Sequence, residues 1–226
     1  VAQAENWEPP QEVDGRLVGE ATFVLPDDLP LGYHTLHARS DNQEATGVLI
    51  VAPAWLGCPE RMGSGRAWGL STQLYSLRSQ RSWGVGDLAD LSDLAVWSGA
   101  DLGAGFVLVN PLHAAEPIAP MEPSPYLPTT RRFANPLYLR LEQIPEYAYL
   151  DQEARSRIDD QRDVLASELD GIDTVDRDMA WTAKREALKL LYARPRSAGR
   201  DAAYRAYLRR EGAGLDDFAT WCALVE

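Results

Sequence analysis

Cysteine and histidine are scarce in this sequence. Its 226 residues include two cysteines, Cys58 and Cys222, and three histidines. The two cysteines lie far apart and match no metal-binding spacing, which argues against a disulfide-rich scaffold and a cysteine-based zinc site. We therefore expect two buried thiols in a reducing compartment.

Long apolar runs are also missing. No run approaches the roughly 18 to 20 residues that a membrane-spanning helix needs. The chain opens at Val1 without a charged segment followed by an apolar one, which is the pattern of a secretory leader. These features predict a cytoplasmic protein with no membrane partner.

Basic residues are outnumbered by acidic ones. Lysine and arginine total 22 against 34 aspartates and glutamates, for a net charge of −12 and an isoelectric point near 4.7. A negatively charged surface repels the phosphates of nucleic acid and cannot replace the cations bound to them. Nucleic acid is therefore excluded as an expected partner, and a neutral substrate fits better.

Local catalytic and cofactor motifs are absent as well. The sequence has no phosphate-binding glycine loop, no nucleophile elbow and no HExxH pair. The stretch "GVGD" at residues 84–87 lacks the third glycine of a dinucleotide fingerprint, and we interpret it as a loop that ends in a helix cap. We expect no cofactor and no metal.

What is present begins with a β-rich segment. Hydrophobic residues make up 45% of the chain, enough for a substantial core. Residues 16–25, "RLVGEATFVL", alternate like a strand, and turn residues then lead to "YHTLHA" and "TGVLIVAP". We predict three antiparallel strands within residues 16–52, too few for a complete sandwich, and a linker at residues 53–67.

A βαβ unit follows the linker. "WGLSTQLYSL" at residues 68–77 and "AGFVLVNPLH" at 104–113 are candidate strands on either side of a helix at 87–101. Asp87 is the candidate N-cap of that helix. The face expected to point inward contains Leu88, Leu91, Leu94 and Ala95.

The chain becomes helical from about residue 150. "RDMAWTAKREALKLLY" at 177–192 has a stripe of alanine and leucine after a candidate N-cap, Asp176, and "RDAAYRAYLRREG" ends at Gly212. A last helix runs to the end of the chain, with Phe218, Trp221, Cys222 and Val225 on one face. Because a complete protein rarely stops inside a helix, we expect the chain to be part of a longer one.

The acidic residues do not suggest a catalytic pair. Glycoside chemistry needs two carboxylates on opposite sides of one bond. Asp87, Asp90, Asp93 and Asp101 fall on a helix face or at its ends, and the acids after residue 150 fall on helical faces. We interpret all of them as solvated surface residues.

The stretch "PSPYLPTTRRFANPLYLR" at residues 123–140 is the most unusual in the chain. Prolines 123, 125 and 128 restrict the backbone around Tyr126. A ring held in this way could stack on the apolar face of a pyranose with little loss of entropy, although packing of Tyr126 in the structure explains the pattern equally well. His113, just past a strand, could contact a substrate hydroxyl or be a hydrogen-bonded structural residue.

Three ordered motifs carry a family resemblance. "GLSTQLYSLRSQRSWGVGDLADL", "VLVNPLHA" and "SPYLPTTRRFANPLYL" resemble the start of the catalytic barrel of the amylomaltases, the 4-α-glucanotransferases of glycoside hydrolase family 77. The resemblance covers about residues 66–147 and, more loosely, the helical region to 226. Residues 1–55 resemble the end of the β-sandwich extension of longer bacterial members.

The resemblance implies an α/β fold with a small all-β amino-terminal part. Residues 1–55 would be the last strands of a β-sandwich, 56–147 the first βα units of a TIM (β/α)8 barrel, and 148–226 part of a helical insertion. The family's function would be transfer of α-1,4-glucan segments between maltooligosaccharides, through a covalent intermediate on an aspartate, without metal or organic cofactor.

Site residues can be carried over only in part. The resemblance implies that Tyr126, with Ser124 beside it, lines the sugar-binding cleft, and His113 is the further candidate for substrate binding. The family's catalytic carboxylates lie on later barrel strands, so no catalytic residue is assigned here and the chain alone is expected to be inactive. A non-catalytic carbohydrate-binding or scaffolding module and a related α-glucan hydrolase remain alternatives.

Overall fold

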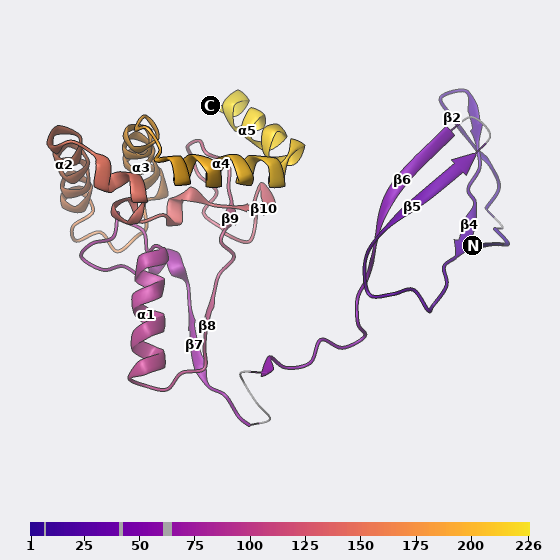
Figure 1. Ribbon diagram of the computed structural model, residues 1–226, viewed down its shortest axis with the longest axis horizontal. Coiled ribbons are helices and arrows are strands. Elements are labelled where there is room, and N and C mark those ends of the chain that lie inside the picture. Colours follow the sequence, from indigo (N-terminus) through magenta and orange to yellow (C-terminus); the bar gives the residue numbers. More distant parts are fainter. Residues whose placement is uncertain (7, 41–42, 61–64) are drawn as a thin grey trace. The chain divides into compact units, whose positions relative to one another are not determined.

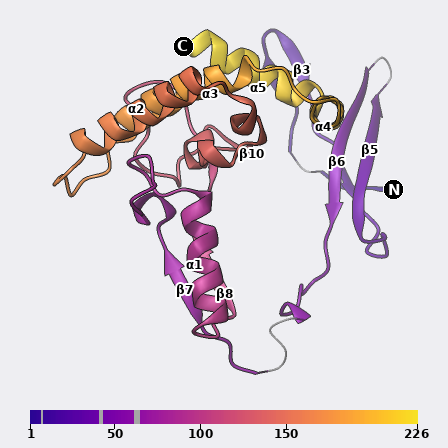
Figure 2. The ribbon, with the colours of Figure 1, turned by 60° about the vertical axis from the view of Figure 1, so that its left-hand side comes forward.

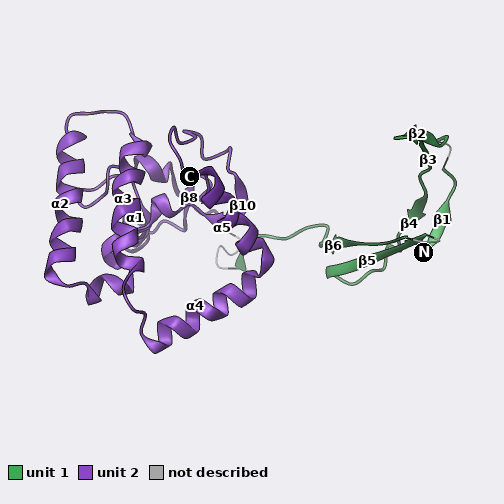
Figure 3. Cartoon of the chain, turned by 90° about the horizontal axis from the view of Figure 1, so that it is seen from above, with its two compact units in different colours: residues 1–63 green, residues 64–226 purple. Residues whose placement is uncertain are grey.

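The computed structural model describes residues 1–6, 8–40, 43–60 and 65–226. The chain divides into two compact units, Val1–Gly63 and Ser64–Glu226 (Figure 3). The first is built of β-strands and the second is mixed α/β, so the expected α/β fold with a small β amino-terminal part is confirmed at this level. Residues 61–64 of the predicted linker lie outside the described residues.

The first unit consists of paired antiparallel strands. β1 pairs with β4, β2 with β3, and β5 with β6, where Tyr33 faces Ile50. None of the side chains described in residues 1–60 is fully buried. The strands are Ala2–Ala4 (β1), Gln11–Val13 (β2), Arg16–Val18 (β3), Thr22–Val24 (β4), Gly32–Ser40 (β5) and Gln43–Val51 (β6).

The two later strands of this unit pair as predicted, but residues 16–25 do not form one strand. They are divided into β3 and β4, which pair with the preceding strands β2 and β1 and not with β5. β3 pairs with β2 because a tight turn lies between them at Asp14 and Gly15, whose φ angles are 51° and 74°. Positive φ at both central residues is the geometry of the hairpin turn that Asp-Gly favours, so the chain reverses there.

The second unit begins with a βαβ motif, as predicted. β7 (Gly69–Thr72) and β8 (Phe106–Val109) are parallel, and α1 (Leu88–Ala100) connects them. The other helices lie beyond the carboxyl ends of the two strands (Figure 1). They are α2 (Gln152–Glu168), α3 (Arg177–Tyr192), α4 (Ala198–Glu211) and α5 (Ala213–Val225), and the remaining strands are β9 (His113–Ala114) and β10 (Thr130–Ala134).

Helices α3 to α5 confirm the sequence pattern, and α2 lies in the region from about residue 150 that was expected to be helical, although its bounds were not predicted. Asp176 caps α3 by accepting a hydrogen bond from the Met179 amide, and α4 ends at Gly212. α2 lies beside α3 (Figure 2). Nearly half of its residues are charged, so its short apolar stripe of Ala154, Ile158 and Leu165 gives little periodic signal.

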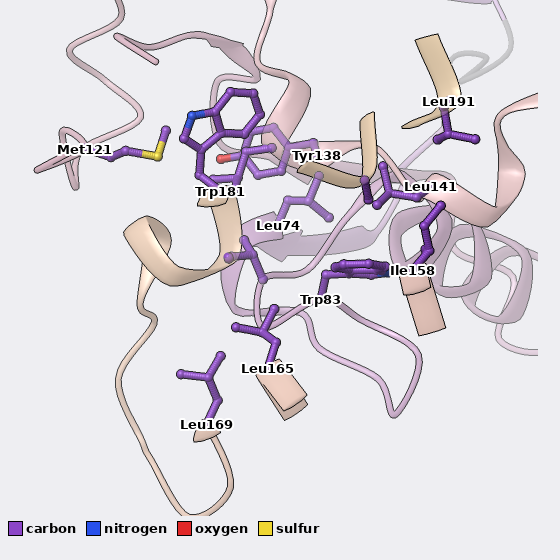
Figure 4. Packing of buried hydrophobic residues seen from close by; sticks show 14 of the residues in the cluster. Leu74, Trp83, Met121, Tyr138, Leu141, Ile158, Leu165, Leu169, Trp181 and Leu191 are labelled. Atoms are coloured by element: carbon purple, nitrogen blue, oxygen red, sulfur yellow. The ribbon is translucent and has the colours of Figure 1, made fainter. Parts of the chain in front are cut away.

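The core lies where the loops after β7 meet α2, α3 and the segment after β10. Leu74, Trp83 and Leu141 are completely buried at its centre (Figure 4). Cys58 is exposed and Cys222 half-buried, and both are free, so the prediction of two buried thiols is wrong for Cys58. None of the described helices is long and apolar enough to cross a membrane.

A buried ion-pair network joins the start of α1 to the segment after β10. Arg140 donates from Nε to Asp87 at 2.5 Å and from Nη2 to Asp90 at 3.0 Å, and all three side chains are at most 5% exposed. Asp90 also accepts hydrogen bonds from the hydroxyls of Ser79 and Ser82. Burial would raise the pKa of Asp90, but these hydrogen bonds and Arg140 together hold it below its ordinary value.

This network corrects two predictions. Asp87 does cap α1, accepting from the amides of Ala89 and Asp90, but Asp87 and Asp90 are not solvated surface residues. Because these carboxylates turn one side of the helix toward Arg140, Leu88 and Ala95 are exposed, whereas Leu91 and Leu94 are half-buried. The apolar face predicted for α1 therefore differs from the face of α1 that is buried.

We expect Arg140→Met to lower the free energy of unfolding by about 3–5 kcal/mol, because two carboxylates would stay buried without their cation. Arg81→Met is the matched control, since Arg81 binds Asp93 of the same helix on the exposed surface and such pairs contribute little. Urea denaturation of both variants measures the difference. Equal stability of the two variants would contradict the structural role of Arg140.

Candidate functional site

A long loop links β9 to β10, and we call residues 115–129 the SPY loop. β9 and β10 close it by pairing Ala114 with Thr130 and His113 with Ala134, and the Thr129 amide donates to the Ala114 carbonyl at 3.0 Å. Prolines occupy positions 117, 120, 123, 125 and 128. Because each proline restricts φ and removes a backbone donor, the loop is stiff and forms few backbone hydrogen bonds of its own.

Tyr126 lies at the tip of a tight turn in this loop. The Leu127 amide donates to the Ser124 carbonyl at 3.1 Å, and Pro125 occupies the second position of the turn, where its fixed φ is favoured. The Ser124 amide in turn donates to a carboxylate oxygen of Glu122 at 2.9 Å. The Tyr126 side chain is 59% exposed, so its ring is open to a ligand instead of being part of the core.

His113 and Ser124 line one small hollow, together with Asn135, Tyr138 and Arg177. Its volume is about 20 Å³, which is enough for one water molecule and far too small for a sugar ring. Tyr126 does not line this hollow. The structure thus brings two of the three predicted site residues together and leaves the third on the neighbouring exposed turn.

Asn110 joins the carboxyl ends of the two parallel strands. Its Oδ1 accepts a hydrogen bond from the Leu74 amide at 2.6 Å, and its Nδ2 donates to the Tyr138 hydroxyl at 3.2 Å. Burial raises the pKa of Tyr138, and the hydrogen bond with Asn110 opposes this increase. The sequence reasoning did not assign Asn110 a role, although a polar residue directly after an apolar strand was the available signal.

The segment after β10 is held by a buried lysine of α3. Lys184 is fully buried, and its Nζ donates to the carbonyls of Leu137 and Leu139 at 2.6 and 3.0 Å. Burial lowers the pKa of this amine to about 8. Asn135 supports the same turn, because its side chain accepts from the Leu137 amide.

Metal ligation and buried carboxylates were the other candidate features of the described residues. In the parts of the chain that the structure describes, no group of three or more histidine, cysteine, aspartate and glutamate side chains is arranged to hold a metal. The two most deeply buried carboxylates, Asp87 and Asp90, are bound by Arg140. They are not accessible to a substrate, so these two carboxylates do not form a catalytic pair.

Comparison with known proteins gives consistent results for both units. The family model described as 4-alpha-glucanotransferase matches residues 72–226, and the model described as the MalQ N-terminal beta sandwich domain matches residues 1–53. The chain is 56% identical to a 4-alpha-glucanotransferase of Mycobacterium tuberculosis over 232 aligned residues, which cover all of this chain and 32% of that protein.

Two further relatives agree. A 4-alpha-glucanotransferase of Haemophilus influenzae is 36% identical over 132 residues, covering 58% of this chain and 19% of the relative. The crystal structure of amylomaltase from Corynebacterium glutamicum matches with a TM-score of 0.76 and 45% identity, covering 98% of this chain and 31% of that one. The chain thus spans about a third of the length of the mycobacterial relative and of this amylomaltase, and it belongs to the 4-alpha-glucanotransferase family, glycoside hydrolase family 77.

Proposed function

We propose that this chain is the amino-terminal part of a 4-α-glucanotransferase that moves α-1,4-glucan segments between maltooligosaccharides. The observation that carries the proposal is the family match over residues 72–226, together with 56% identity over the whole chain to a relative of that name. The exposed Tyr126 on a proline-stiffened loop supports it, because a fixed aromatic ring suits the apolar face of a glucose unit.

The chemistry we propose is retaining transfer. One carboxylate would form a covalent glycosyl intermediate, and a second would act first as acid and then as base. We propose that both come from residues outside this chain, with no metal or organic cofactor. The role of the residues described here would then be to bind and orient the glucan, with Tyr126 as the stacking platform and Ser124 and His113 beside it.

The domain organisation we propose follows the same relationship. Residues 1–55 would be the last strands of a β-sandwich, 56–147 the first βα units of a TIM barrel, and 148–226 part of a helical insertion. The parallel pair of β7 and β8 with α1 between them supports the barrel. Active sites of such barrels lie at the carboxyl ends of the strands, which is where the SPY loop follows β8 and β9.

Tyr126→Ala in the full-length enzyme should lower kcat/KM about tenfold, because it removes the stacking contact with the sugar. Tyr126→Phe keeps the ring and should retain most of the activity. Neither change should shift the melting temperature by more than about 2 °C, since substitutions of exposed residues usually change stability little. Disproportionation rates on maltotriose, with paired melting curves, measure both effects.

The opposite pattern would contradict this role. If Tyr126→Ala lowered the melting temperature by several degrees while the folded fraction turned over normally, the residue would be structural. Leu127→Ala is a matched control, because Leu127 is the next residue and is similarly exposed, at 65%, but offers no aromatic ring. It should leave kcat/KM close to that of the wild type.

The 226-residue chain alone should have no transferase or hydrolase activity, because the proposed catalytic carboxylates lie outside it. Incubation with maltotriose, followed by an assay for glucose and longer oligosaccharides, measures this. Products above the buffer control would show that a catalytic pair exists within residues 1–226. The full-length enzyme serves as the positive control for the assay.

A further inference from the structure

Two side chains of α3 hold the backbone of the SPY loop. The Asp178 carboxylate accepts a hydrogen bond from the Met121 amide at 2.8 Å. One turn further along the helix, the Trp181 indole donates from Nε1 to the Pro117 carbonyl at 2.8 Å. Residues three apart lie on the same face of a helix, so one face of α3 contacts two points of the loop.

These contacts replace hydrogen bonds that the loop cannot form by itself. The prolines at 117 and 120 have no amide hydrogen, so this part of the loop has fewer donors with which to form a regular turn. An ionised carboxylate that accepts from an amide forms a stronger hydrogen bond than a neutral acceptor does. Trp181 and Met121 are also 9% and 8% exposed and belong to the hydrophobic core, so core packing holds one residue of each hydrogen bond in place.

The connection from this anchor to Tyr126 is short and stiff. Only four residues separate Met121 from Tyr126, and two of them are Pro123 and Pro125. With φ fixed at these positions, a displacement of Met121 would be transmitted along the loop instead of being absorbed by it. Lys184 of the same helix holds the backbone on the far side of β10, at Leu137 and Leu139.

We propose that Asp178 and Trp181 are positioning residues, through which α3 sets the place of the Tyr126 ring for the glucan. This inference rests on the proposed function of Tyr126 as a sugar platform. It adds that the helical segment helps to determine substrate binding, although neither residue is expected to touch the sugar. Without the two anchors, the ring would sample several positions, and part of the binding free energy would be lost in ordering it.

The first test is Asp178→Ala in the full-length enzyme. We expect kcat/KM on maltotriose to fall about three- to tenfold, and by no more than in Tyr126→Ala. Asp178→Asn keeps an oxygen acceptor for the Met121 amide and should restore most of the activity. Asp176→Ala is the matched control: it removes the cap of the same helix, so it should lower the melting temperature but leave kcat/KM close to that of the wild type.

A double-mutant cycle separates positioning from general stability. If Asp178 acts through the Tyr126 ring, adding Asp178→Ala to Tyr126→Ala should cause no further loss in kcat/KM. Multiplicative losses in the double variant would overturn the inference. So would an Asp178→Ala enzyme that is as active as the wild type while Tyr126→Ala is impaired.

The proposed function fails separately, because unchanged kcat/KM in Tyr126→Ala itself would refute the sugar platform whatever Asp178 does. If Asp178→Ala does not accumulate as folded protein, Trp181→Phe provides the same test, since it removes the Nε1 donor and keeps an aromatic ring, although a smaller one, in the core. Hydrogen exchange of a peptide covering residues 115–129 gives a readout independent of activity. We expect faster exchange in Asp178→Ala than in Asp176→Ala, and equal rates would count against the anchor.

Discussion

The buried contact of Arg140 with Asp87 and Asp90 is the interaction on which the second unit depends. It ties the amino-terminal end of α1 to the segment that follows β10. Burying three charges is favourable only when each one is paired and hydrogen-bonded. Ser79, Ser82 and the amide of Asp87 complete the bonds of Asp90, so the network also orders the loop that leads from β7 into α1.

The candidate site is built between this network and α3. Arg140 lies two residues after Tyr138, whose hydroxyl accepts from Asn110 at the end of β8. Lys184 holds the carbonyls on either side of Tyr138, and Asp178 and Trp181 hold the SPY loop. The loop that carries Tyr126 is therefore fixed from several sides, while the Tyr126 ring itself stays exposed.

Sequence patterns predicted the elements whose signals are local. The βαβ unit, the Asp87 and Asp176 caps and the end of α4 at Gly212 follow from short-range chemistry, and the structure confirms them. The Asp14–Gly15 turn also has a local signal, the Asp-Gly pair that favours a hairpin, but the sequence analysis placed its first strand after it and assigned no partner before it. The bounds of α2 were not predicted, because nearly half of its residues are charged and its apolar stripe is short.

Long-range pairing could not be predicted in the same way. Nothing in the sequence near Asp87 or Asp90 shows that Arg140 will bind them, so both were interpreted as surface residues. Three side chains of α3, Asp178, Trp181 and Lys184, bind backbone atoms 45 to 64 residues away. These contacts leave no sequence pattern at the residues whose backbone is bound, because every residue type has a backbone carbonyl and nearly every one has an amide hydrogen. Tyr126 could be singled out because its prolines are adjacent, and its role as a sugar platform remains a prediction.

A structure of the full-length enzyme with a bound maltooligosaccharide would test the central claim most directly. The account predicts a glucose unit stacked on the Tyr126 ring, with the Met121 amide still bound to Asp178 and the Pro117 carbonyl to Trp181. A glucan that occupies the catalytic cleft without contacting Tyr126 would contradict it.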